Sequence, residues 1–202
     1  TSHPINMDDE LIALHSNNKK LMPFLHLPVQ SGSSKILKMM NRKYDVEFYR
    51  DIIFKIRDKS PNIEISSDFI IGYPGESEQD FINTLDLIDD IKFTQSYSFI
   101  YSARPGTKSA MIEDNLTKKV KSERLKILQS KLTEIQHDFN KTHVGKKTSV
   151  LIENQSATNP EYYFGRTPYM QSVYIKSNNL INGEEKDIKI TSCNHKSLYG
   201  TC

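Results

Sequence analysis

The sequence predicts an α/β domain built on parallel strands, followed by a small all-β barrel. Strand-like apolar runs alternate with helix-like segments across the first hundred residues, and strands joined through helices pair in parallel. Two of these runs end in polar, glycine-containing turns, where α/β domains place their ligand sites. After Gly145 the pattern changes to short β-type runs separated by Asn, Gly and Pro, as in a small barrel.

Helix and strand signals follow one another along the first part of the chain. Three predicted helices begin after a serine or an aspartate, whose side-chain oxygen caps the first free backbone amides. The predicted helices cover residues 7–20 and segments that follow Ser33, Asp45 and Ser77. The predicted strands cover residues 24–29, 63–71 and 93–101. Ser77 and Asp80 have the spacing of a capping box, and Glu76 is interpreted as an acidic residue at the same helix start.

A long helix is predicted over residues 117–142, with a leucine-rich stripe that indicates core packing. Residues 117–147 carry nine Lys or Arg against three acids, whereas residues 76–90 carry six acids and no base. The basic block is compatible with a phosphate-facing surface, although a solvated helix face is the more common explanation. Beyond residue 145, β-type runs are predicted at residues 148–153, 172–176 and 187–191.

Composition restricts the class of protein. The chain has 202 residues, a formal net charge of +2 and no apolar run long enough to span a membrane. Its two cysteines, Cys193 and Cys202, lack the spacing of a disulfide framework or a metal site, which favours a reducing, cytoplasmic location. The first residues, Thr-Ser-His-Pro, do not form a signal peptide, and the chain reads as though it begins within a fold.

The two strand corners and one later loop carry a specific resemblance. The stretches are "HLPVQSGSSKILKMMNRKY" (26–44), "SSDFIIGYPGE" (66–76) and "YSFIYSARPGT" (97–107). Together they resemble the carboxyl half of the catalytic domain of the radical-SAM methylthiotransferases. The β segment, with "GRT" at 165–167, is similar to the TRAM domain, an RNA-binding module. The resemblance implies a partial parallel β/α barrel over residues 1–144 and an OB-like TRAM barrel over residues 145–202.

Differences between branches of this family favour the MiaB-type branch, which modifies tRNA. Ribosomal-protein methylthiotransferases tend to show "QHAS" where this chain has "QSGS" from Gln30. The threonylcarbamoyl-adenosine branch tends to show "TD" and "GFPTE" where this chain has "SD" and "GYPGE". The resemblance therefore implies radical methylthiolation of N6-isopentenyladenosine beside the anticodon. Two alternatives stay open: another substrate, such as a ribosomal protein, or an inactive RNA-binding remnant.

The same resemblance implies S-adenosylmethionine and 4Fe-4S clusters as cofactors, because no side chain performs this radical chemistry. The family's CxxxCxxC motif is missing from this chain, so we expect the sequence to be a truncated form and the isolated chain to be inactive. The implied partners are the tRNA anticodon stem-loop, a sulfur donor and the missing amino-terminal half, with no membrane.

Seven residues are candidates for contact with S-adenosylmethionine, from the resemblance and from their place at strand ends. Polar groups there can reach the ribose or the aminocarboxylate, a glycine lets adenine lie against the backbone, and an arginine can pair with the carboxylate. A buried mid-strand aspartate needs a polar partner. The candidates are Gln30, Ser31, Ser67, Asp68, Gly72, Tyr73 and Arg104.

Four cations in the TRAM-like segment are candidates for RNA contact. Tyrosines and a phenylalanine lie between them in the sequence, and this mixture suits loop RNA because bases stack on rings while phosphates pair with cations. An ordinary barrel surface is the alternative explanation. The candidates are Lys146, Lys147, Arg166 and Lys176.

Overall fold

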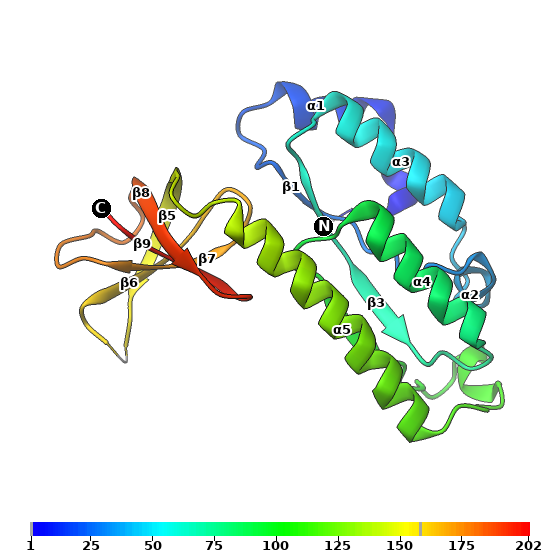
Figure 1. Cartoon of the computed structure of the whole chain (residues 1–202). Coiled ribbons are helices and arrows are strands. Elements are labelled where there is room, and N and C mark those ends of the chain that lie inside the picture. Colours follow the sequence, from blue (N-terminus) through cyan, green and yellow to red (C-terminus); the bar gives the residue numbers. More distant parts are fainter. Residues whose placement is uncertain (1, 158) are drawn as a thin grey trace. The chain divides into compact units, whose positions relative to one another are not determined.

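The structure is a computed structural model that describes residues 2–157 and 159–202 (Figure 1). The chain folds into two compact units. The first unit comprises Thr1–Leu21 and Leu25–Leu132, and the second comprises Met22–Phe24 and Thr133–Cys202. Within the described residues, no helix is both long enough and apolar enough to cross a membrane.

Helices and strands alternate through the first unit, as the sequence predicts. The helices are α1 (Asp9–Asn17), α2 (Ser34–Met39), α3 (Val46–Lys59), α4 (Glu78–Ile91) and α5 (Lys118–Lys141), which continues into the second unit. The strands are β1 (Phe24–His26), β2 (Glu64–Ser66), β3 (Asp68–Ile71) and β4 (Tyr97–Ile100). Short 3₁₀ turns lie at Pro4–Asn6 and Lys108–Met111.

The strands pair in parallel, which confirms the predicted class. β3 pairs with β4 from Asp68↔Tyr97 onward, and an isolated parallel bridge joins Gln30 to Phe69. The predicted strand 63–71 is divided at Ser67, because its amide donates to the Ser96 hydroxyl (3.0 Å) and leaves the backbone ladder. β4 is also shorter than predicted and begins at Tyr97, because the left-handed backbone of Gln95 (φ 49°) is incompatible with a strand at that position.

One face of this sheet is covered by helices and the other is open. Phe69 and Ile71 are fully buried, whereas Asp68 and Ile70 alternate to the half-buried face. On the covered face the Phe69 ring meets Phe93 edge-on at 5.3 Å, and the Tyr49 hydroxyl of α3 donates to the Leu27 carbonyl (2.7 Å). The open face therefore carries the alternate residues of β3, and these position the candidate ligand site.

The predicted helix caps are formed by side chains. Asp45 accepts from the Phe48 amide (2.8 Å), and Ser77 and Asp80 make a reciprocal capping box. Asp80 also accepts from Ser33 (2.6 Å) and Lys35 (2.7 Å), which lie at the start of α2. Burial alone would raise the pKa of Asp80, but these hydrogen bonds outweigh it and hold the pKa well below its usual range. The start of α4 is thereby tied to the start of α2.

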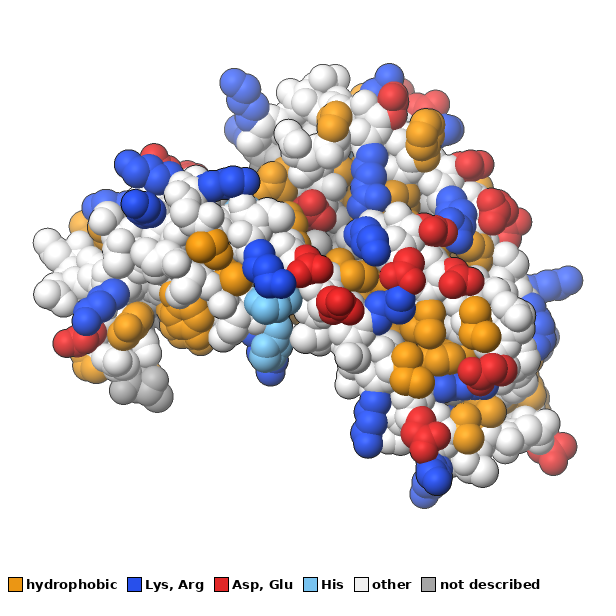
Figure 2. Space-filling model, viewed as in Figure 1, with side chains coloured by type: hydrophobic (Ala, Val, Ile, Leu, Met, Phe, Trp, Pro, Cys, Tyr) orange, Lys and Arg blue, Asp and Glu red, His pale blue; other side chains and the backbone are white. Residues whose placement is uncertain are grey.

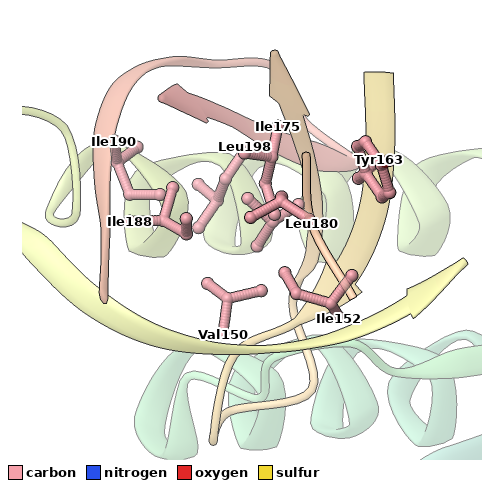
Figure 3. Close-up of a cluster of buried hydrophobic side chains, with 9 residues drawn as sticks. Val150, Ile152, Tyr163, Ile175, Leu180, Ile188, Ile190 and Leu198 are labelled. Atoms are coloured by element: carbon pink, nitrogen blue, oxygen red, sulfur yellow. The ribbon is translucent and has the colours of Figure 1, made fainter. Parts of the chain in front are cut away.

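The second unit contains a closed barrel of five strands in the order β5-β6-β7-β9-β8. Its strands are β5 (Lys147–Gln155), β6 (Tyr162–Arg166), β7 (Ser172–Lys176), β8 (Glu185–Cys193) and β9 (Ser197–Thr201). β7 and β9 run parallel, and the other neighbours run antiparallel, as in an OB-like barrel. Inward side chains of all five strands fill the interior (Figure 3), among them Val150, Ile152, Val173, Ile188 and Leu198. Sequence analysis did not identify β6 and β9.

Partial burial of Glu64 in the first unit changes the pKa of its carboxyl. Burial of its carboxyl raises the pKa from 4.5 to about 7, although the charge of Arg57 acts in the opposite direction. Between these two pH values the folded chain keeps a proton on Glu64 that the unfolded chain has lost. The contribution of Glu64 to the free energy of unfolding therefore falls as the pH rises from 4.5 to about 7. Glu64→Gln should raise the free energy of unfolding by about 1–2 kcal/mol at about pH 8, after allowance for solvent screening, and by much less near about pH 5. Urea denaturation at the two pH values measures this, and an equal gain at both would contradict it.

Candidate ligand site at the strand ends

The open face of the first unit's sheet lines a cavity of about 640 Å³. Its walls come from β3, β4 and the segments that follow the strands, which is the end of an α/β sheet where ligands bind. Four of the seven predicted contact residues lie together in this wall: Gln30, Asp68, Tyr73 and Arg104. The remaining surface of the cavity is largely apolar and aromatic, with Ile70, Phe99 and Tyr101 among its members.

Asp68 enters the cavity wall because it begins β3 on the open face. Its side chain is 30% exposed, and its Oδ2 lies 3.6 Å from His26 Nε2. The His26 ring is held in turn by the Ser66 hydroxyl, 2.9 Å from Nδ1. A carboxylate that is oriented in this way, and still open to the cavity, can accept hydrogen bonds from ligand hydroxyl or ammonium groups.

Gln30 lies four residues beyond the end of β1, at an isolated bridge to Phe69, in an unusual backbone conformation. Its φ is 75°, in the left-handed region that residues other than glycine rarely adopt. Backbone bonds on both sides maintain this geometry: its amide donates to the Asp68 carbonyl and its carbonyl accepts from the Ile70 amide, each at 2.9 Å. The strand pairing thus compensates for a conformation that costs energy, as at many functional sites.

The other three predicted contact residues make packing interactions outside the cavity wall. Ser31 Oγ accepts from the Ser33 amide (3.2 Å), and Ser67 Oγ accepts from the Val29 amide (2.9 Å). Gly72 has φ +71°, and a Cβ there would lie 2.7 Å from Lys121 Cγ. These roles within the fold explain the residue types without a ligand.

Several residues of the cavity wall are not among the seven predicted contacts. Arg42 lies there one residue after Asn41, whose left-handed backbone (φ 59°) ends the α2 region. No strand-end pattern in the sequence marks Arg42, because it follows a helix and not a strand. Tyr101 packs edge-on against Tyr73 at 4.9 Å, and within the described residues its buried hydroxyl has no hydrogen-bond partner. Tyr101 lines the same cavity as Asp68 and Arg104.

The described residues do not fit an iron–sulfur cluster. Within residues 2–157 and 159–202, no three His, Cys, Asp or Glu side chains are grouped as metal ligands. Cys193 and Cys202 both lie in the second unit, and the cavity wall includes neither. Any such cluster would need ligands from outside this chain.

The basic block of α5 is mostly engaged within the fold. Lys121, Arg124 and Lys131 pair with Asp114, Glu76 and Asp89 of the first unit. Lys141 pairs with Asp138, one turn away. Figure 2 shows cations interspersed with acidic side chains on the visible face. Four of the nine cations in residues 117–147 are therefore held in ion pairs, which reduces the positive charge available for a phosphate-facing surface.

The four predicted RNA-contacting cations lie at the barrel and just before it. Lys146 and Lys147 are exposed at the start of β5, and Lys147 is the register partner of Lys189 on β8. Arg166 Nε lies 3.4 Å from Glu153, and Lys176 Nζ lies 3.4 Å from Glu161. The structure therefore separates a lysine pair at the start of β5 from two cations that are held by carboxylates at opposite ends of the β6–β7 pair.

Comparison with known proteins gives two domain matches and several similar sequences. Residues 1–88 match the Radical SAM superfamily, and residues 141–202 match the TRAM domain. The chain is 52% identical to the tRNA-2-methylthio-N(6)-dimethylallyladenosine synthase of Rickettsia felis and 51% identical to that of Rickettsia conorii, over 99% of its own length. It covers 45% of each, so it spans about half the length of these curated relatives.

One solved structure is similar in fold. It is coproporphyrinogen III oxidase (HemN) from Escherichia coli, whose title describes it as a Radical SAM enzyme. The TM-score is 0.55 at 15% sequence identity, and the match covers 82% of this chain and 45% of that one. At this identity the likeness supports the fold of the chain, and the chemistry of the site rests on the residues of the chain itself.

Proposed function

Since residues 1–88 match the Radical SAM superfamily and residues 141–202 match the TRAM domain, we propose that the chain supplies the carboxyl-terminal part of a tRNA methylthiotransferase. The proposed reaction adds a methylthio group to N6-isopentenyladenosine beside the anticodon. Identity of 50–52% to curated synthases of this kind over 99% of the chain supports the assignment. The observation that carries it is the polar cavity at the strand ends.

The cavity offers complementary groups for S-adenosylmethionine. Asp68 can accept from the ribose hydroxyls or the ammonium group, and Arg104 or Arg42 can pair with the carboxylate. The aromatic wall around Tyr73 and Tyr101 excludes water and supplies rings beside which adenine can lie. When bound, S-adenosylmethionine supplies the radical and the methyl group that side chains cannot provide. The role of this chain is to orient that molecule.

The remaining elements of the proposed enzyme lie outside this chain's residues. The iron–sulfur clusters and the sulfur donor would be held by the part of the protein that corresponds to the other half of the relatives. The TRAM domain would hold the tRNA, with Lys146 and Lys147 as phosphate contacts. We place the boundary between the catalytic part and the TRAM domain at residues 144 and 145, and we assign the protein to the cytoplasm, where tRNA is modified.

Methylthiolation by an intact protein tests the activity. This protein would carry the chain together with the amino-terminal half that its relatives possess, and it would be assayed on tRNA and on ribosomal proteins. The product on isopentenyl-adenosine tRNA alone would support the proposal. Product on a ribosomal protein would favour the other substrate class, and tRNA binding without turnover would favour an RNA-binding remnant.

Binding of S-adenosylmethionine to the same intact protein tests the cavity. Asp68→Asn and Arg104→Ala should each weaken binding by about 10- to 100-fold, because each removes a charge-assisted hydrogen bond. The matched controls are Asp58→Asn and Lys59→Ala, an exposed pair at the end of α3. Unchanged affinity in both cavity variants, measured by calorimetry, would remove these residues from the site.

A further inference from the structure

Three aromatic rings form a continuous row across the barrel of the second unit. Phe164 of β6, Tyr174 of β7 and Tyr199 of β9 are register partners on neighbouring strands. The Phe164 and Tyr174 ring centroids lie 5.6 Å apart, and the Tyr174 and Tyr199 rings are stacked at 5.7 Å with an angle of 21°. We refer to these three residues as the ring row.

The ring row lies on the outside of the barrel. On each of the three strands the neighbours of these residues, such as Tyr163, Val173 and Leu198, are buried in the barrel core. Successive side chains of a strand point to opposite faces, so the ring row points outward, and its members are only partly buried. Three adjacent rings on the outer face are more than the barrel needs for its core, and they provide stacking surface.

Two cations border the ring row, and each is held by a carboxylate. The Arg166 guanidinium lies 5.3 Å from the Phe164 ring, donates to the Met170 carbonyl and pairs with Glu153. Lys176 lies two residues beyond Tyr174 on β7 and pairs with Glu161. Both ion pairs are 3.4 Å long and solvent-accessible, so they contribute little to stability and can be exchanged for phosphate contacts.

We propose that the ring row is a platform on which unpaired RNA bases stack, with Arg166 and Lys176 released from Glu153 and Glu161 to bind the adjacent phosphates. Rings with bordering cations match RNA loops, where bases turn outward and the backbone runs beside them. A protein partner could also cover the rings, but an RNA loop presents flat bases and a regularly charged backbone side by side, which matches rings with bordering cations more closely. The proposal deepens the proposed function, because it rests on the TRAM domain being the part that holds RNA.

Binding of a fluorescent RNA hairpin with an unpaired loop to the 202-residue chain tests the platform. Tyr174→Leu and Tyr199→Leu should each weaken binding by about 10-fold, with an unchanged dependence on salt, because stacking involves no ion release. Tyr199→Phe keeps the ring and should bind as the parent does. Glu153→Gln and Glu161→Gln should tighten binding several-fold by freeing the cations. The matched control is Phe54→Leu, a substitution of a 74%-exposed ring on α3, which should change nothing.

Circular dichroism of each variant shows whether the barrel is folded, and Tyr199→Phe against Tyr199→Leu compares two variants that differ only in the ring. The proposal is overturned if folded leucine variants bind the hairpin as tightly as the parent, or if the parent binds no RNA. It is also overturned if the substitutions weaken binding to a blunt RNA duplex as much as binding to the hairpin. If the intact protein methylthiolates tRNA but the leucine variants bind the RNA hairpin normally, the platform is rejected and the proposed reaction is kept. Ring-dependent RNA binding without methylthiolation would reject the proposed reaction and keep the platform.

Discussion

Replacing Arg124 by methionine should lower the free energy of unfolding of the first unit by about 3–5 kcal/mol. Arg124 and Glu76 are both almost fully buried, with 6% and 3% of their surfaces exposed. Arg124 Nη1 donates to Glu76 Oε2 at 2.8 Å and to the Glu76 carbonyl at 3.2 Å. Methionine would fill much of the space but would leave the Glu76 carboxylate buried without its cation, which is the costly half of a broken pair.

The surroundings of Glu76 increase this cost. Its Oε2 also accepts from the Gly72 amide (3.0 Å), so the carboxylate holds the turn that follows β3. Its Oε1 is buried and has no hydrogen-bond partner in the described structure. Burial raises the pKa of Glu76, although Arg124 and the Gly72 amide oppose the rise. Without Arg124 the pKa should rise further, so the loss of stability should shrink as the pH falls and the carboxyl gains a proton.

Urea denaturation followed by far-UV circular dichroism measures this loss, since most helices lie in the first unit. Glu78→Ala is the matched control: Glu78 pairs with the same guanidinium at 2.7 Å but is 71% exposed, and its removal should cost less than about 1 kcal/mol. The double variant Arg124→Met with Glu76→Gln should recover part of the stability. A loss below about 1 kcal/mol for Arg124→Met at neutral pH would show that the pair is not a structural anchor.

Local features of the fold were predictable because their physics is local. Helix caps at Asp45 and Ser77 depend on residues three positions away, and the structure has both. Glu76 shows the limit: the sequence suggests an acid at a helix start, whereas the fold pairs it with Arg124, 48 residues later. No periodicity encodes that partner. The same limit explains why the cations of α5 resemble an RNA-facing block in the sequence, although several form ion pairs within the fold.

The strands and the cavity show the same division. Apolar runs indicated the parallel strands, but the break at Ser67 depends on the hydrogen bond that its amide donates to the side chain of Ser96, on a neighbouring segment. β6 and β9 were missed because their outward aromatic residues interrupt the alternation of polar and apolar residues that marks a half-buried strand. In the cavity, Gln30 could be anticipated from its place after an apolar run, and Asp68 from its charge within one, although the structure has Asp68 at the start of β3 and not in mid-strand. Arg42 could not, because it reaches the cavity from the end of a helix region.

Gly32→Ala should lower the free energy of unfolding of the first unit by about 3 kcal/mol. Gly32 lies in the turn between β1 and α2, and its amide donates to Thr84 Oγ1 of α4 at 3.0 Å. An added Cβ would lie 2.5 Å from the Asn83 carbonyl oxygen and 2.5 Å from Thr84 Cα. Both atoms belong to the backbone of a helix, so no side-chain rotation relieves the overlap, and the turn or the helix must move.

A control substitution separates the steric overlap at Gly32 from the general cost of replacing a glycine. Gly106→Ala is the control: it has no atom within 4 Å of the added Cβ, and only its φ of +81° opposes alanine, at a cost of about 1 kcal/mol. Shortening the nearby side chain in Gly32→Ala with Asn83→Ala should not restore stability, because the contact is with the main chain. Recovery in that double variant would show that the side chain, and not the backbone, limits the space. Since Gln30 lies two residues before Gly32 in its left-handed conformation, displacement of this turn should also weaken S-adenosylmethionine binding to the intact protein.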